Sequence, residues 1–223
     1  MKIENNILKH YLKNVIFITG SAYAGKSTMC ALLAEKYSLY HCGENYKLDK
    51  FLEIATPKFQ PNLCYQRTNW QEFINRTPEE YEKWIYGSGR EIAEMEITEL
   101  IRLSMSQKII VDTNIPVDIL KEIAGYHQVA VMLSPQSMSA DRFFDRSDPD
   151  KTFIMEQIQK AENPENTLAN FKACIARVNS KEHYVDYADG GFFTLVREDA
   201  DKDTRVETLA ALEKHFGLID ECL

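Results

Sequence analysis

A stretch of eight residues near the start of the chain has the residue types and spacing that hold phosphate. It begins at Gly20, has a second glycine at Gly25 and ends on Lys26 and Ser27, in the pattern G-x-x-x-x-G-K-[ST]. The glycines let the backbone fold closely around an anion, the lysine reaches the β- and γ-phosphates of a nucleotide, and the serine hydroxyl ligates Mg²⁺. The alternative is an exposed turn that binds no phosphate. We expect the nucleotide to be bound by the loop residues Gly20, Ser21, Ala22, Tyr23, Ala24, Gly25, Lys26 and Ser27, together with Thr28, which follows the loop.

The elements on either side of this stretch suit that role. Residues 15–19 are apolar, β-branched and aromatic, which predicts a buried strand, and residues 26–37 are rich in Ala, Leu, Glu and Lys, which predicts a helix. The glycines therefore lie at a strand-to-helix turn. The amino end of a helix has unpaired N–H groups and the positive end of the helix dipole, and both favour a bound anion.

The rest of the chain alternates apolar runs with helical patterns. Apolar runs that show little alternation and are separated by helices are typical of a parallel sheet covered on both faces, so we expect an α/β fold. A short amphipathic lead-in over residues 1–13 is expected to pack outside the core. The further predicted strands are residues 39–42, 108–112, 128–133 and 190–196, and the further predicted helices include residues 117–124, 139–146 and 204–216.

A long, strongly charged helical region separates the second predicted strand from the third. Prolines divide residues 44–107 into pieces, and Thr77 followed by Pro78 predicts a helix start with an N-cap threonine. Residues 89–103 have the pattern of a long amphipathic helix. We expect its acidic face to be solvated, and that face carries Glu91, Glu94, Glu96 and Glu99.

Composition narrows the class of protein. The chain has 223 residues, a formal charge of −8 and 44% hydrophobic residues, and its pI is near 5.2. This acidic balance argues against a binder of nucleic acid or of an anionic membrane. The five cysteines have no metal-ligand spacing, and no apolar run has the length of a signal peptide or a membrane span. We expect a soluble cytoplasmic protein with reduced thiols.

Three features together carry a resemblance to a known family: the glycine-rich loop on the first strand, Asp112 at the end of a later strand, and the pair Arg142 and Arg146 after the next strand. In this respect the chain resembles the small-molecule P-loop kinases, a superfamily that holds the nucleoside monophosphate kinases and shikimate kinase. The likeness covers residues 15–218 in the order of elements.

The resemblance implies one P-loop NTPase domain over residues 1–223. It would be a three-layer α/β/α fold whose five-stranded parallel sheet has the strand order 2-3-1-4-5. A helical insertion that binds the acceptor would occupy about residues 44–107. A lid would occupy about residues 139–165.

The resemblance also implies roles for residues that bind ATP and Mg²⁺. Asp112 would hold the metal with Ser27, usually through water, although an aspartate there also suits a turn. Arg142 would stack on the adenine and Arg146 would reach the phosphates, with Lys151 as a further candidate for the donor nucleotide. The alternative for the arginines is an exposed helix that pairs them with neighbouring aspartates.

The acceptor is less well defined. Asp49 and Glu44 follow the second predicted strand, where related kinases carry an acid that accepts the proton of the acceptor hydroxyl, and either residue is a candidate. Arg67 and Arg90 are candidates for binding an anionic acceptor, and the alternative for Arg90 is a pair with Glu94. Asp112 is followed by Thr-Asn-Ile-Pro. Nucleoside monophosphate kinases of the adenylate type carry an arginine here that binds the acceptor phosphate. Its absence disfavours a plain nucleoside monophosphate as the acceptor.

We therefore expect an ATP-dependent, Mg²⁺-requiring kinase that acts on a small metabolite or a nucleotide-like acceptor. It would bind neither nucleic acid nor membrane, and it would be a monomer or a homodimer. The alternative is a nucleotide-binding switch protein that hydrolyses nucleotide slowly and signals by its conformation.

Overall fold

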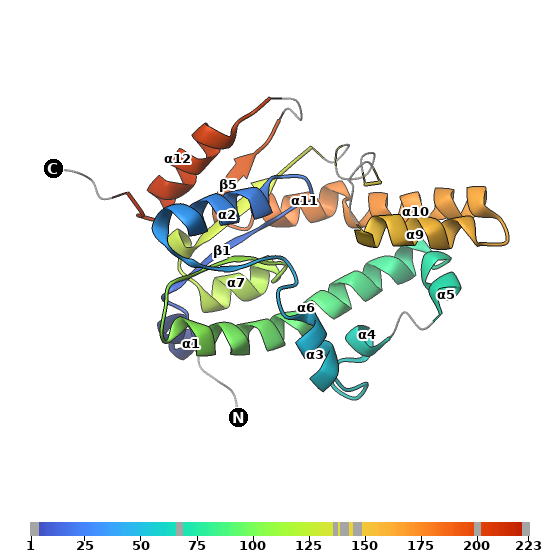
Figure 1. Cartoon of the computed structure of the whole chain (residues 1–223), viewed down its shortest axis with the longest axis horizontal. Helices are drawn as coiled ribbons and strands as arrows, with labels where there is room; N and C mark the ends of the chain where they lie inside the picture. Colours follow the sequence, from blue (N-terminus) through green and yellow to red (C-terminus); the bar gives the residue numbers. More distant parts are fainter. Residues whose placement is uncertain are drawn as a thin grey trace.

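The computed structural model describes residues 5–65, 69–135, 138, 143–144, 149–198 and 202–219. Helices and strands alternate along the chain (Figure 1), which agrees with the pattern of apolar runs. In chain order the elements are α1 Asn5–Tyr11, β1 Val15–Gly20, α2 Lys26–Tyr37, β2 Tyr40–Cys42, α3 Leu48–Ile54, α4 Pro61–Cys64, α5 Trp70–Ile74, α6 Pro78–Ser104, β3 Ile109–Asp112, α7 Val117–Ile123, η1 Tyr126–Gln128, β4 Val129–Leu133, α9 Pro149–Gln159, α10 Pro164–Val178, α11 Lys181–Ala188, β5 Phe193–Val196 and α12 Arg205–His215.

The five strands form one parallel sheet in the order β2-β3-β1-β4-β5. This confirms the predicted α/β class and the predicted strand order. Ile18 of β1 is in register with Asp112 of β3, and Gly20 of β1 is in register with Met132 of β4. The carboxyl ends of the three central strands therefore meet at one edge of the sheet, where the glycine-rich loop begins.

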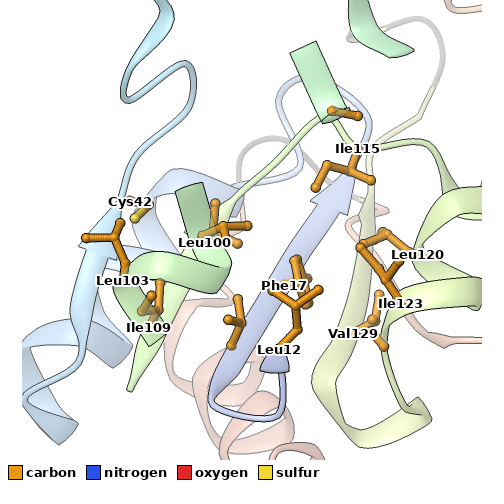
Figure 2. Packing of buried hydrophobic residues seen from close by; sticks show 14 residues of the cluster. Leu12, Phe17, Cys42, Leu100, Leu103, Ile109, Ile115, Leu120, Ile123 and Val129 are labelled. Atoms are coloured by element: carbon orange, nitrogen blue, oxygen red, sulfur yellow. The ribbon is translucent and has the colours of Figure 1, made fainter. Parts of the chain in front are cut away.

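Both faces of the sheet are covered by helices. On one face, Phe17 packs in a cluster to which α1, α6 and α7 contribute (Figure 2). On the other face, Ile18 packs with apolar residues of α2 and α12. The prediction that residues 1–13 pack outside the core is wrong at Leu12, which has an exposed fraction of 0% and belongs to the first cluster. Alternate side chains of β1 therefore pack into two separate hydrophobic clusters, one on each face of the sheet.

Helix α6 is a single helix of 27 residues, whereas the sequence suggested a helix from Pro78 and another over 89–103. Its start is as predicted, because the side chains and backbones of Thr77 and Glu80 form a reciprocal capping box. The helix continues through Gly87, where a Cβ atom would lie 2.5 Å from the side chain of Asn62. Close contact with α4 thus accounts for the glycine in mid-helix.

The acidic residues of α6 correct a second prediction, because most of them are not solvated. Glu91 accepts hydrogen bonds from the backbone N–H groups of Asn62 and Leu63, and Glu96 is buried. Glu99 forms ion pairs with Lys47 and Arg102. Of the four glutamates named above, Glu94 alone is exposed.

A third hydrophobic cluster lies away from the sheet. It joins Phe73 of α5 and Tyr81 of α6 to Ile158 of α9 and to Phe171 and Ile175 of α10. Figure 1 shows α9 and α10 beside α5 and the amino-terminal part of α6. The regions predicted as insertion and lid therefore share one core. Within the described ranges, no helix is both long and apolar enough to cross a lipid bilayer.

Candidate functional site

The loop between β1 and α2 has a backbone that would not accept a side chain at Gly20. Gly20 has φ 131°, and a Cβ atom there would lie 1.9 Å from the carbonyl oxygen of Met132. Tyr23 and Gly25 also have positive φ, 65° and 90°. These left-handed residues reverse the chain within a few positions, so that the loop wraps around the amino end of α2.

The amino end of α2 has donors that the helix does not use. The first intrahelical hydrogen bond runs from the Met29 N–H to the Gly25 carbonyl, at 3.1 Å. The N–H groups of Lys26, Ser27 and Thr28 precede it and have no acceptor within the helix. Lys26 is 7% exposed, and its Nζ donates to the Ser21 carbonyl at 3.1 Å. The ammonium group and the helix end together favour an anion inside the loop.

Ser134, which sequence reasoning did not identify, fastens the loop to the end of β4. Its backbone N–H donates to Ser21 Oγ at 2.8 Å, and its hydroxyl donates to the Ala22 carbonyl at 2.7 Å. From α9, Lys151 approaches the loop, with its Nζ 3.4 Å from the Tyr23 hydroxyl and 5.1 Å from the ring centroid. The loop is thus held from the sheet and contacted from α9.

Ser27 and Asp112 form the polar centre of the site. The Ser27 hydroxyl donates to Asp112 Oδ2 at 2.5 Å. Asp112 is 1% exposed, and its Oδ1 is buried without a hydrogen-bond partner among the described residues. Burial raises the pKa of Asp112, while Lys26 and the Ser27 hydroxyl oppose that change. A buried carboxylate with a spare oxygen beside a hydroxyl suits a hard divalent cation.

No group of three or more His, Cys, Asp or Glu side chains that could hold a metal occurs in the described part of the chain. Mg²⁺ does not need such a group, because it usually keeps several water ligands and is bound through one or two protein groups plus phosphate oxygens. Ser27 and Asp112 therefore fit the predicted metal role, with the unpaired Oδ1 as the observation that supports it.

A cavity of about 1210 Å³ opens from the loop and extends between α6, α5 and α9. Its lining includes Lys26, Ser27 and Asp112 at one end and aromatic residues of α5 and α6 at the other. This volume exceeds the range of about 300–1,000 Å³ that is usual for one small ligand. The cavity has room for a nucleotide and a second molecule.

Two predicted acceptor residues line the cavity. Glu44 accepts a hydrogen bond from Asn114 Nδ2 at 3.1 Å. Arg90 pairs with Asp118 at 2.9 Å, and not with Glu94, the partner considered from the sequence.

Asp49, predicted as a candidate catalytic base, is not among the residues that line the cavity. It is exposed in the first turn of α3, whereas the cavity is lined from that helix by Leu48, Phe51 and Leu52. The phase of a short helix separates these positions. Three predicted residues lie outside the described part of the chain, and they are Arg67, Arg142 and Arg146.

Glu96 is an acidic residue of the site that sequence reasoning assigned to solvent. It lines the cavity, is 6% exposed, and has a pKa raised to about 7 by burial and by the charge of Asp112. A hydrogen bond with the Thr113 side chain opposes that rise. The spacing in the sequence could have indicated that Glu96 is buried. It lies three residues after Ala93 and four before Leu100, and this places it on the buried face of α6.

Comparisons with known proteins add no family to this geometry. No protein-family model matches the sequence, and a search of curated proteins finds no match either.

Proposed function

We propose that the chain is an ATP-dependent, Mg²⁺-requiring kinase that transfers the γ-phosphoryl group to a small acceptor. The observation that carries the proposal is the hydrogen bond between Ser27 and Asp112, beside a glycine-rich loop at a helix amino end and at the mouth of a large cavity. A parallel sheet in the order 2-3-1-4-5 is the arrangement expected of a P-loop kinase and supports the same reading.

The loop would bind the phosphates of ATP. The N–H groups at the start of α2 would donate to phosphate oxygens, and Lys26 would exchange the Ser21 carbonyl for the β- and γ-phosphates. Because Lys26 is already directed into the loop by that hydrogen bond, a short side-chain movement suffices. Lys26 would then neutralise charge that develops on the transferred group.

Ser27 and Asp112 would hold Mg²⁺ at the edge of the sheet. The metal supplies charge stabilisation for the phosphate oxygens in reactions of this class. The spare Oδ1 of Asp112 gives the carboxylate a position for a metal or for a metal-bound water.

The second part of the cavity would hold the acceptor. A P-loop protein that only hydrolyses nucleotide needs no second compartment, whereas a kinase needs one that excludes water from the reacting phosphate. The cavity continues past Asp112 into the aromatic region of α5 and α6, which favours a kinase over the alternative of a nucleotide switch.

The test measures ADP formation from Mg-ATP by the purified protein across nucleosides, nucleotides, sugars, aminoglycosides and shikimate-like acids. The control is Lys26→Ala, and a thermal-shift series with ATP runs beside it. ATP at about 100 times its dissociation constant adds about 2.7 kcal/mol of stability, or on the order of 5 to 10 °C at this chain length. The expected result is one acceptor class that raises ADP release, with loss of the signal in Lys26→Ala.

Two other outcomes separate the alternatives. Stabilisation by ATP without acceptor-dependent turnover favours the nucleotide switch. No stabilisation by any nucleotide refutes both functions, because each requires the loop to bind phosphate.

A further inference from the structure

One face of α6 runs along the cavity from an aromatic end to an acidic end. Tyr81, Ile85, Ser88, Ile92 and Glu96 all line the cavity, and their spacing of three or four residues places them on one helical face. A molecule lying along this face would contact aromatic and aliphatic groups at one end and a carboxyl group at the other.

The aromatic end is composed of rings from several elements. Trp70 and Phe153 are 4.7 Å apart between ring centroids, and Phe73 and Trp84 are 5.1 Å apart, both in edge-to-face arrangement. All four side chains line the cavity. The Trp84 indole N–H donates to the Asn62 carbonyl, which fixes the ring. Fixed ring edges and faces suit a flat apolar group.

The middle of the face is open. Ser88 is small, and a Cβ atom added at Gly89 would have no other atom within 4 Å. The first atom of a side chain at Gly89 would therefore displace no neighbour, and a larger side chain there would take up space at the cavity wall.

Glu96 lies at the acidic end of the cavity, close to residues of β2, β3 and the segments that follow them. From β3, it faces Asp112 and forms a hydrogen bond with Thr113, whose hydroxyl accepts the Ile115 N–H at 3.0 Å and so keeps its own proton to donate. Burial and, after it, the charge of Glu96 raise the pKa values of Cys42 in β2 and of Tyr46 in the segment after β2. The Tyr46 hydroxyl is buried without a hydrogen-bond partner among the described residues, and it also lines the cavity. A hydroxyl compound bound here would satisfy both groups.

The charges around the cavity disfavour an anionic acceptor. Arg90 is the one arginine among the described lining residues, and it pairs with Asp118, so an acceptor anion that used Arg90 would have to break that pair. Of the lining lysines, Lys26 and Lys151 lie at the nucleotide loop and Lys121 lies on α7, and the described lining carboxyl groups outnumber the lining cations. An acceptor anion would also enter a region that contains the carboxyl groups of Glu44, Glu96 and Asp112.

On the basis of the proposed kinase function, we infer that the acceptor is an uncharged alcohol with a flat ring, and that Glu96 is its catalytic base. The ring lies among the aromatic residues and the hydroxyl lies at Glu96, on the side of the cavity that Asp112 and the nucleotide loop also line. As the acceptor oxygen forms its bond to the γ-phosphorus, its proton passes to the Glu96 carboxylate. The bond from the γ-phosphorus to its bridging oxygen breaks, and ADP leaves with the electron pair.

Binding is tested by fluorescence, because the only two tryptophans of the chain, Trp70 and Trp84, both line the cavity. Thymidine and 2-phenylethanol serve as neutral alcohols with a flat ring. Glucose, which has no flat ring, and thymidine monophosphate, which is anionic, serve as comparisons. We expect a saturable fluorescence change with the neutral alcohols that have a flat ring. In Gly89→Phe the change should disappear while stabilisation by Mg-ATP persists, and Gly89→Ala should behave as the wild type. A response confined to glucose or to the monophosphate overturns the inference, as does no response to any probe.

Catalysis is tested with Glu96→Gln and with Glu94→Gln as the matched control, since Glu94 is exposed on the same helix. For the acceptor that the wild type phosphorylates, we expect kcat to fall at least about 100-fold in Glu96→Gln, with acceptor binding and Mg-ATP stabilisation retained. Glu96→Asp should recover part of the rate, and Glu94→Gln should keep all of it. Unchanged kcat in Glu96→Gln overturns the inference but leaves the kinase function intact. That function itself fails if the wild type neither binds nucleotide nor forms ADP.

Discussion

Replacing Glu96 by glutamine should change how the stability of the fold depends on pH. The pKa of Glu96 is raised from 4.5 to about 7 in the folded protein. The folded state therefore binds this proton more tightly than the unfolded state does. The stability that the proton contributes is fully present below pH 4.5 and is lost as the pH rises to about 7.

The size of the effect follows from that interval. Each pH unit in which the unfolded chain has released the proton and the folded chain retains it costs about 1.4 kcal/mol. The interval from 4.5 to about 7 corresponds to a loss of about 3 kcal/mol for the wild type. Glutamine does not titrate, so Glu96→Gln should lack this loss. In a chain of this length the difference amounts to on the order of 6 to 12 °C in Tm.

The assay is urea unfolding of both proteins at intervals between pH 4 and pH 8, with Glu94→Gln as the control for charge on the same helix. The free energy of unfolding of Glu96→Gln should gain on that of the wild type between about pH 4.5 and pH 7 and then run parallel to it up to pH 8. Curves for Glu96→Gln and wild type that stay parallel from pH 4 to pH 8 would refute the reasoning, because they would show that Glu96 ionises as freely in the folded protein as in water.

Other substitutions test the loop and the helix start. Gly20→Ala should destabilise the fold by about 2–4 kcal/mol in urea unfolding, because its Cβ would lie 1.9 Å from the Met132 carbonyl oxygen. The control is Gly43→Ala, whose Cβ would have no atom within 4 Å. Equal stability of the two variants would contradict the prediction. Asp112→Asn should leave the free energy of unfolding unchanged or higher, since burial raises the pKa of Asp112. It should abolish the additional rise in Tm that Mg²⁺ gives over ATP alone. A retained Mg²⁺ effect would exclude the metal role of Asp112. Thr77→Ala should cost about 1 kcal/mol, measured by thermal unfolding, through loss of the capping box.

The sequence was sufficient for the sheet and for the loop. Apolar runs predicted the five strands, and the spacing of Gly20, Gly25 and Lys26 marked the loop between β1 and α2. Asp112 was also identified, because the carboxyl ends of parallel strands meet at one edge of a sheet. These predictions depend on local patterns and on the geometry of parallel strands, which one sequence contains.

The acceptor side of the site depends on helix phase and on distant partners, and there the predictions were weaker. Asp49 and Glu96 are both acids on helices, and only the buried face of α6 brings one of them into the cavity. Arg90 finds Asp118, 28 residues away, in place of Glu94 on its own helix. A single sequence does not reveal such a partner, because the contact exists only after α6 and α7 have packed on the sheet.

Residues of the third hydrophobic cluster contribute both to the stability of the fold and to the shape of the cavity. Phe73 and Tyr81 belong to that cluster and also line the cavity, so the same rings hold α5 and α6 to α10 and contact whatever enters. A substitution that reshapes this end of the cavity for another acceptor also removes part of the core. Laboratory evolution of a new acceptor preference at these positions therefore requires compensating stabilisation elsewhere in the chain, acquired before or together with the change.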